Sequence, residues 1–339
     1  MQSKWQSFLQ QQSANISEGL LLDFGDPIAE HAHALNEDSI TDLSRLDVLK
    51  ISGKDASDFL HGQLSSDVSA LAVNKVQMSS WCNIKGRVIV SFLLYRSHDC
   101  FYILLEREMM ELVSKRLGMF VMRSDVSIHN QSDELMRIGI RGESLHKHLQ
   151  QTLDASSTPE TFMLLAMQDS LPRSILLIPL EHAPALWQQL SAEAHRIGEK
   201  AWSMFDIKAG IAWVGKSGTE EFLPQSLNLD LTGGLSFTKG CYPGQEIIAR
   251  MHFRGKLKQR LFLANVAINE PPQITTKLYS TDVTKHIGVV ANATMQNENN
   301  CLMLVVLELE YATSGPIHLG EENGPVLNLE ALPYSPDSV

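Results

Sequence analysis

The chain has 339 residues, which at roughly 150 residues per domain predicts two or three domains. Apolar residues make up 44% of the sequence and charged residues 20%, and the 21 Gly and 13 Pro follow no short period. These values exclude a collagen-like, coiled-coil or low-complexity chain. The formal charge is 28 − 39 = −11, so the surface as a whole does not suit nucleic acid or an anionic membrane. Any polyanion site must therefore be local.

The sequence indicates a cytoplasmic protein without a membrane partner. No apolar run approaches the roughly 18 to 20 residues that cross a bilayer. The opening residues MQSKWQSFLQQQSA lack the apolar core of a signal peptide. In that reducing compartment the four widely spaced cysteines, Cys82, Cys100, Cys241 and Cys301, predict neither a disulfide framework nor a structural zinc site.

Residues 1–37 are polar and are predicted to form an N-terminal tail. They contain the stretch HAHALNED, in which His31 and His33 could suggest a metal. No further ligand stands at a spacing that would complete a site. The two histidines are therefore interpreted as solvated, and no metal is predicted.

Residues 38–130 are predicted to form a first α+β half. LDVLKISG alternates apolar and polar residues, as a half-buried strand does, and DASDFLHGQLSSDV follows as a short helix. SSWCNIKGRVIVSFLLYR and CFYILLE predict two strands joined by the polar turn RSHD. Residues 107–121 have the apolar recurrence of a helix. Asp58 and Asp67, near the first helix, could face a ligand, but exposed acids are the commoner explanation for such residues. His61 is interpreted as a surface or partly buried side chain and not as a base.

Residues 131–200 repeat this pattern as a second α+β half. RIGIRG, TFMLLAM and SILLIPL predict strands, SLHKHLQQTL and APALWQQLSAEAHRIG predict helices, and TLDASSTPET predicts a loop. In residues 258–339 the helical signal is lost. Short alternating runs cut by Gly, Pro, Asn and Asp predict a small antiparallel barrel there.

Glycine and positive charge concentrate between Gly233 and Arg260. Five glycines in this segment indicate sharp turns or a close approach of the backbone to a ligand. From Lys239 to Arg260 there are six cations and one acid. This cluster is either a solvated surface or a landing site for a polyanion, such as a pteridine cofactor with its glutamate tail or RNA phosphates.

Cys241 stands inside this segment, just before a predicted helix. Pro243 followed by GQEIIARM is typical of a helix that opens near a proline. A helix N-terminus and the nearby Lys239 both favour thiolate over thiol. Two interpretations stay open: a reactive or ligand-contacting cysteine, and a buried cysteine in a glycine-rich turn.

The stretch KGCYPGQE, residues 239–246, resembles the K-G-C-Y-x-G-Q-E signature of the YgfZ family of folate-binding tRNA-modifying proteins, relatives of the glycine-cleavage aminomethyltransferases. ISGKDASDFLHGQLSSDV, PQSLNLDLTGGLSF, ARMHFRGKLKQR and LPYSP are also similar to that family, so the resemblance covers most of residues 43–336. It implies two α+β halves and a C-terminal antiparallel β-barrel. It also implies that residues 201–257 return to a central cavity that holds tetrahydrofolate or a one-carbon derivative.

The resemblance further implies which side chains contact folate. One family tryptophan falls on Trp202, where a flat indole would stack on the pterin. Another falls on Leu46, which could offer only apolar contact. Arg250 and Arg254 are expected to attract the glutamate tail, and Cys241 is expected at the rim as a reactive thiol. The remaining expected contacts are Lys239, Tyr242, Gln245 and Glu246.

One departure from the related transferases bears on catalysis. Where the aminomethyltransferases carry two aspartates after G-x-V-I, this sequence has Val90 and Ser91. A valine can neither accept a proton nor stabilise a developing cation. Aminomethyl transfer by the usual route is therefore not expected, and the protein is not expected to be an enzyme of that kind.

The resemblance implies an accessory protein that supports iron–sulfur enzymes, including those that methylthiolate tRNA. Cys241 would contact an iron–sulfur cluster or a partner's sulfur. Two alternatives remain: a folate-dependent one-carbon transferase, and a module that binds tRNA directly through its basic segment. The net charge of −11 disfavours the module that binds tRNA directly.

Overall fold

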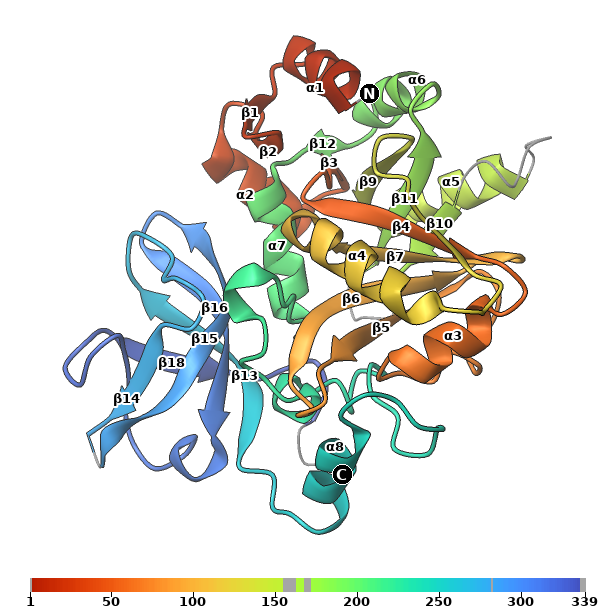
Figure 1. Ribbon diagram of the computed structural model, residues 1–339. Helices are drawn as coiled ribbons and strands as arrows, with labels where there is room; N and C mark the ends of the chain where they lie inside the picture. The colour runs from red at the N-terminus through yellow and green to blue at the C-terminus, as the bar shows by residue number, and fades with distance from the viewer. Residues whose placement is uncertain (1, 155–162, 168–171, 282, 336–339) are drawn as a thin grey trace.

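The chain folds into two α+β halves and a C-terminal barrel, which confirms the predicted fold class (Figure 1). The computed structural model describes residues 2–154, 163–167, 172–281 and 283–335. In these ranges the strands form two five-stranded sheets, one closed six-stranded barrel and a short hairpin. Within the same ranges, no helix combines the length and the apolar character needed to cross a membrane.

The first sheet is antiparallel throughout and has the order β5-β6-β7-β4-β8. Its strands are β4 (Leu46–Ser52), β5 (Lys75–Cys82), β6 (Val88–Arg96), β7 (Cys100–Glu106) and β8 (Ser127–Asn130). The helices α3 (Ala56–Gln63) and α4 (Met110–Val121) pack against it. The stretch SSWCNIKGRVIVSFLLYR, expected as one strand, is divided between β5 and β6. The turn between them contains Gly86, whose φ of 72° favours glycine.

The second sheet has the order β10-β11-β9-β3-β12. Its strands are β3 (Ser39–Asp42), β9 (Leu135–Arg141), β10 (Met163–Ala166), β11 (Arg173–Pro179) and β12 (His195–Arg196), and its helices are α5 (Glu143–Asp154) and α6 (Ala183–Ser191). The helix predicted over APALWQQLSAEAHRIG ends at Ser191, because residues 195–196 pair with β3 in parallel. Most of the predicted loop TLDASSTPET lies outside the described residues.

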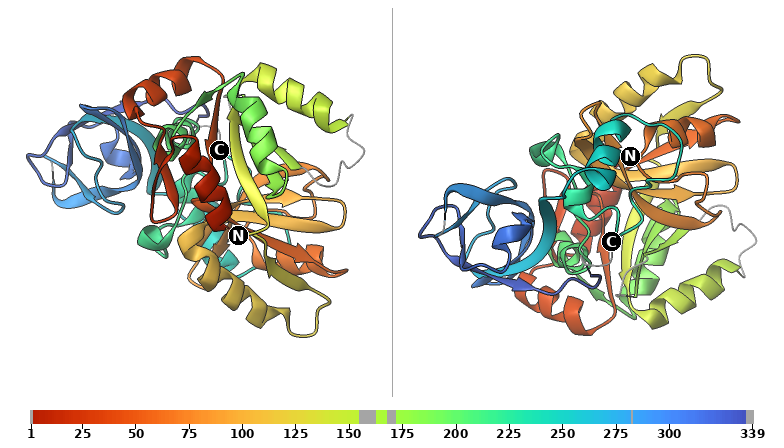
Figure 2. Two further views of the ribbon diagram at one scale, coloured as in Figure 1. Left: turned by 90° about the horizontal axis from the view of Figure 1, so that it is seen from above. Right: turned by 90° about the horizontal axis from the view of Figure 1, so that it is seen from below.

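Alternating side chains place an apolar core on each face of both sheets. In β4, Leu46 and Val48 face the interior between the sheets, whereas Leu49 and Ile51 face α3 and α4. β11 alternates in the same way. The sheets therefore form the inner layers, with α3 and α4 outside the first. The helices α1 (Gln2–Gln11), α5 and α6 cover the second sheet (Figure 2).

The C-terminal barrel has the strand order β13-β16-β15-β14-β17-β18. Its strands are β13 (Gln259–Ala267), β14 (Lys277–Ser280), β15 (Val283–Asn297), β16 (Asn300–Glu308), β17 (Ile317–Leu319) and β18 (Val326–Glu330). In β16, Met303 and Val305 fill the barrel, while Leu304 and Val306 join the core that lies between the sheets. One strand thus serves both cores and attaches the barrel to the two halves.

The prediction of an N-terminal tail over residues 1–37 was wrong. This region forms α1, the hairpin of β1 (Asn15–Ser17) and β2 (Leu20–Asp23), and α2 (Pro27–Asn36). Trp5 and Leu9, one helical turn apart, are buried against the second sheet. The indole Nε1 of Trp5 donates to Asp42 Oδ1 at 2.8 Å. The polar composition concealed this narrow apolar stripe, which is buried only because the second sheet receives it.

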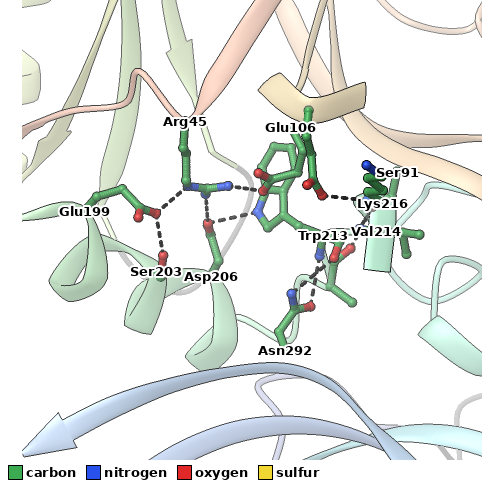
Figure 3. Close-up of polar contacts among 12 residues, drawn as sticks. Arg45, Ser91, Glu106, Glu199, Ser203, Asp206, Trp213, Val214, Lys216 and Asn292 are labelled. Atoms are coloured by element: carbon green, nitrogen blue, oxygen red, sulfur yellow. Dashed lines mark hydrogen bonds and ion pairs between the residues drawn. The ribbon is translucent and has the colours of Figure 1, made fainter. Parts of the chain in front are cut away.

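A buried network of charges joins the three parts of the fold (Figure 3). Asp206, in α7 (Glu199–Lys208), accepts a hydrogen bond from Arg173 of β11 at 2.6 Å and from Arg45, just before β4, at 2.8 Å. Trp213 Nε1 donates to the same carboxylate at 2.9 Å. The backbone of Trp213 exchanges two hydrogen bonds of 3.1 Å with the side chain of Asn292 in β15. The carboxylate of Asp206 thus connects both sheets and the barrel.

Arg45 has two further carboxylate partners. They are Glu106, at the end of β7, and Glu199, in the first turn of α7, whose Oε1 lies 2.7 Å from Nε of Arg45. The guanidinium also lies 4.9 Å from the centroid of the Trp213 ring. Burial raises the pKa of Glu106 to about 7, although the positive charge of Arg45 opposes the shift. The network therefore depends on every partner being in place.

Asp206→Ala is expected to lower the free energy of unfolding by about 3–5 kcal/mol, because it removes a carboxylate that two buried arginines share. Urea unfolding followed by tryptophan fluorescence measures the loss. The matched control is Glu143→Ala, which breaks an exposed ion pair with Lys147 and should leave the midpoint unchanged. Similar midpoints for both variants would contradict the central role of Asp206.

Candidate functional site

A cavity of about 770 Å³ lies between the first sheet, the segment after α7 and the C-terminal segment. A volume of this order suits a cofactor-sized ligand. The apolar lining residues are Ala70, Leu71, Ala72, Val76, Met78, Leu93, Met167, Ala209, Ile211, Leu231 and Pro333. The remaining lining residues are Asp67, Lys75, Gln77, Thr232, Gly233, Ser236 and Tyr334. The cavity thus combines largely apolar walls with a few polar groups.

Asp67 is the acid among the described lining residues. Its Oδ1 accepts hydrogen bonds from Ser69 Oγ at 2.6 Å and from the backbone N–H of Ala70 at 3.1 Å. The hydrogen bond from Ser69, together with that from Ala70, lowers the pKa of Asp67. Beside it, Gln77 Nε2 donates to Ser66 Oγ at 2.8 Å. The cavity therefore presents an ionised carboxylate held in a fixed position.

Sequence reasoning interpreted Asp67 as a surface acid and did not single out Lys75 or Gln77. An acid that follows a short helix carries no local signal that separates a ligand contact from an exposed side chain. Tyr334 is different, because LPYSP was part of the resemblance. Its hydroxyl donates to the carbonyl oxygen of Gly210 at 2.8 Å and places the C-terminal segment at the cavity.

Lys239 anchors the KGCYPGQE segment to the end of α3. Its ammonium donates to the carbonyls of Leu64 at 2.6 Å and Ser66 at 3.1 Å, and also to that of His61. Carbonyls at a helix C-terminus have no partner within the helix, so a cation is favourable there. Burial lowers the pKa of Lys239 to about 8. Lys239 is therefore a structural tie beside Asp67, which corrects the expectation of a folate-contacting cation.

The rest of the KGCYPGQE segment packs tightly against the turn between β5 and β6. Gly244 has a φ of 81°, and a Cβ there would lie 2.4 Å from the carbonyl oxygen of Asn83, so glycine is required. The helix α8 (Gln245–Phe253) begins directly afterwards, as predicted. Gln245 Nε2 donates to the Lys239 carbonyl at 3.3 Å. Tyr242 is buried, with its ring centroid 4.8 Å from the Lys239 ammonium.

Cys241 is exposed, whereas the other three cysteines are buried. Burial raises the pKa of Cys82 and Cys301 to about 12, so these two thiols are inert at neutral pH. The neighbour of Cys241, Gly240, faces α3, since a Cβ there would lie 3.8 Å from Nε2 of His61. The interpretation of Cys241 as a buried thiol is excluded. Cys241 therefore has an accessible thiol, in a turn that is held in place by Lys239 before it and by the close packing of Gly244 after it.

The six cations of the segment divide into two groups. Lys239 and Arg260 are buried, and Arg260 forms an ion pair of 2.6 Å with Asp230. The other four cations lie in α8 and the turn after it, are exposed, and have no ion-pair partner within the described parts of the chain: Arg250, Arg254, Lys256 and Lys258. Neither they nor Glu246, which is also exposed, line the cavity. They form an exposed basic surface instead.

Trp202 and Leu46 lie in the protein core, and both are at most 1% exposed. The indole of Trp202 packs on Gly139, where a Cβ would approach two ring carbons to 2.9 Å. The guanidinium of Arg173 lies 5.5 Å from the centroid of the indole. Since no face of the ring is open, Trp202 cannot stack on a ligand in this arrangement. This corrects the expectation of a stacking surface there.

The two positions expected to lack a carboxylate lie in β6. Val90 and Ser91 are both fully buried. Ser91 Oγ donates to the carbonyl of Ala212 at 2.9 Å and accepts from the N–H of Val214 at 2.8 Å. Ser91 therefore attaches the segment between α7 and the barrel to the first sheet (Figure 3).

Comparison with known proteins defines the class of this fold. Residues 23–171 match the family model of the GCVT N-terminal domain. The crystal structure of glycine cleavage system aminomethyltransferase T from Bartonella henselae is similar over 96% of both chains, with a TM-score of 0.78 and 15% sequence identity. The chain therefore has the fold of the T-protein aminomethyltransferases.

Curated relatives narrow this class. The chain is 28% identical over 308 residues to a protein named tRNA-modifying protein YgfZ from Edwardsiella ictaluri, covering 87% of this chain and 93% of the relative. It is 29% identical to the protein of the same name from Cronobacter sakazakii, over 84% of this chain and 89% of the relative. These matches confirm the resemblance that KGCYPGQE indicated: the chain is a relative of tRNA-modifying protein YgfZ.

Lys239→Met is expected to lower the free energy of unfolding by about 2 kcal/mol, because buried carbonyls lose a charged donor. The folded protein releases the Lys239 proton at a lower pH than the unfolded chain. The stability advantage of Lys239 over Met should therefore grow as the pH rises from about 8 to about 10.5. Urea unfolding at several pH values measures both effects. The control Lys256→Met removes an exposed cation and should change neither the free energy of unfolding nor its pH dependence. If Lys239→Met were as stable as the native chain at every pH, the hydrogen bonds of Lys239 would contribute nothing to stability.

Proposed function

We propose that this protein is a folate-binding accessory factor for tRNA modification, acting in the cytoplasm. It would hold tetrahydrofolate or a one-carbon derivative in the cavity and present Cys241 to a partner. The observation that carries the proposal is the cavity of about 770 Å³ next to the turn that exposes the thiol. The T-protein fold supports folate as the ligand. The name of the curated relatives supports a role in tRNA modification.

The residues of the cavity suit a reduced pteridine. Met78, Leu93 and Ile211 offer apolar walls for a flat ring system. The carboxylate of Asp67 can accept hydrogen bonds from the exocyclic amine and a ring N–H of a pterin, and charge-assisted bonds of this kind are strong. The Gln77 amide adds a second polar contact. Folate, when bound, supplies the carrier of a one-carbon unit, while the chain's own residues orient it and exclude water.

The glutamate tail of folate would meet Lys75. Lys75 is the cation among the described lining residues, and it is exposed at the start of β5. A glutamate carboxylate that extends out of the cavity at this point could form an ion pair with Lys75 and would stay exposed to solvent. Arg250 and Arg254 lie outside the lining, so their charges suit a larger polyanion better than the tail.

Cys241 is proposed to act on an iron–sulfur partner. An exposed cysteine sulfur can ligate a cluster or exchange with a sulfur of another protein, and tRNA methylthiotransferases are iron–sulfur enzymes of the proposed kind. The buried Val90 and Ser91 support an accessory role, because a valine can neither accept a proton nor stabilise a cation, and the hydroxyl of Ser91 is already bonded to the backbone of Ala212 and Val214.

A second candidate function is direct contact with tRNA. The four exposed cations of α8 and its following turn stand close in sequence to Phe253, which is 68% exposed. Cations next to an open aromatic ring are a common arrangement for single-stranded nucleic acid. Such binding would weaken steeply with salt, and it is compatible with folate in the cavity.

Asp67→Asn is expected to weaken the binding of folinic acid about tenfold or more, because an ionised acceptor is replaced by a neutral amide. Met78→Trp, which fills the cavity, should abolish binding. Calorimetry with folinic acid measures both, and melting temperatures verify that the variants fold. The double variant Arg250→Ala, Arg254→Ala is the control and should bind as the native chain does. If Asp67→Asn and Met78→Trp both bind normally, the cavity is not the folate site.

Cys241→Ser is expected to abolish support of tRNA methylthiolation in cells that lack the native copy. Because the side chain lies outside the cavity lining, the purified variant should still bind folinic acid. Mass spectrometry of tRNA nucleosides measures the modification. Full rescue by Cys241→Ser would remove the thiol from the proposed function and leave folate binding intact.

A further inference from the structure

The junction of α2 with β3 carries three potential metal ligands that the proposed function does not use. His33 and Glu37 stand at the end of α2, and His195 begins β12. One ligand atom from each lies within 4.8 Å of the other two. Glu37 is a local partner of His33, four residues further along the chain, and the fold adds the distant His195.

Backbone hydrogen bonds fix this arrangement. β12 pairs with β3 so that His195 lies opposite Ser39, and the N–H of His195 donates to the carbonyl of Asp38 at 2.9 Å. Glu37 directly precedes Asp38, the residue that accepts this hydrogen bond. The N–H of Glu37 donates to the carbonyl of His33 at 2.9 Å, and residues four apart on a helix share one face. The cluster therefore follows from secondary structure that the fold requires in any case.

The side chains converge on the carboxylate of Glu37. Nε2 of His195 lies 2.5 Å from Oε2, and Nδ1 of His33 lies 3.5 Å from Oε1. The two imidazole rings stack in parallel, with centroids 3.8 Å apart and planes 8° apart, and each has a nitrogen near the same carboxylate. Arg141 donates to the backbone carbonyls of Glu37 and Leu35. Within the described residues, no guanidinium pairs with the Glu37 carboxylate.

We propose that His33, Glu37 and His195 form a binding site for a divalent transition metal, and Zn²⁺ fits this donor set best. Zn²⁺ binds two imidazoles and a carboxylate at about 2.0–2.2 Å, with water in the remaining position. Tetrahedral ligand atoms are then about 3.4 Å apart, so rotation of the side chains is enough to close the site. The side chains of His195 and Glu37 are 46% and 49% exposed, so an ion can enter from solvent.

The proposed metal site is open to solvent on one side, and a bound ion would link α2 to the start of α7. His33, His195 and Arg196 also line a hollow of about 460 Å³, where water on the metal would lie. β12 leads directly into α7, and buried Glu30 of α2 already accepts from the N–H of Gly198 at 2.7 Å. A bound ion would add a second tie between α2 and the start of α7. It would thereby stabilise the folded state, because the unfolded chain lacks the site.

The test uses the full chain as Cys241→Ser, so that the exposed thiol does not bind metal. After treatment with EDTA and dialysis, calorimetric titration with Zn²⁺ is expected to show one site per chain. Co²⁺ in place of Zn²⁺ should give the visible absorption of a four-coordinate site. His33→Ala and His195→Ala should each weaken Zn²⁺ binding about tenfold or more, because each removes one of three ligands. Zn²⁺ should also raise the melting temperature of the parent.

His286→Ala removes an exposed histidine of β15 and is the matched control, which should bind Zn²⁺ like the parent. Melting temperatures in EDTA verify that the variants fold. If an alanine variant does not fold, Glu37→Gln replaces it, and this variant should also weaken Zn²⁺ binding. Absence of Zn²⁺ binding by the parent would overturn the proposal. Undiminished binding in the double variant His33→Ala, His195→Ala would overturn it as well, and the cluster would then be an ion pair only.

Discussion

The carboxylate of Asp206 holds the three parts of this fold together. It is the common acceptor for Arg45 beside the first sheet, Arg173 in the second sheet and the indole of Trp213, whose backbone bonds to Asn292 in the barrel. Buried charges are costly to desolvate and are stable only when their partners are correctly placed. The cavity is lined by β5 and β6 of the first sheet and by Ala209 and Ile211, which follow α7, so the network holds two of its walls in place.

The cavity and the exposed thiol share one short support. Lys239 holds the KGCYPGQE segment on the carbonyls of His61, Leu64 and Ser66, and Ser66 directly precedes Asp67, the cavity carboxylate. A ligand at Asp67 and a partner at Cys241 would therefore contact the two ends of the same rigid unit. In the function proposed above, this arrangement would link occupancy of the cavity to presentation of the thiol.

Prediction from sequence succeeded where a local period determines the outcome. The strand β4, the helix α4 and the barrel strands follow from alternation or from the recurrence of apolar residues in a helix. It failed for residues 1–37, because Trp5 and Leu9 form a stripe too narrow to recognise until the second sheet covers it. It also assigned Trp202 to a ligand, whereas the indole is buried in the core, packed on Gly139 and close to the guanidinium of Arg173.

By itself, the sequence determined the three-part architecture and the tight turn of KGCYPGQE, because strand alternation and the backbone freedom of Gly244 act over a few residues. Only the tertiary structure decided which members of that segment face solvent, with Lys239 buried and Cys241 exposed. It also decided that Asp67 faces a cavity and that His195 lies beside His33. Each of these outcomes depends on contacts between distant segments, and no local pattern of residues specifies which segments will meet.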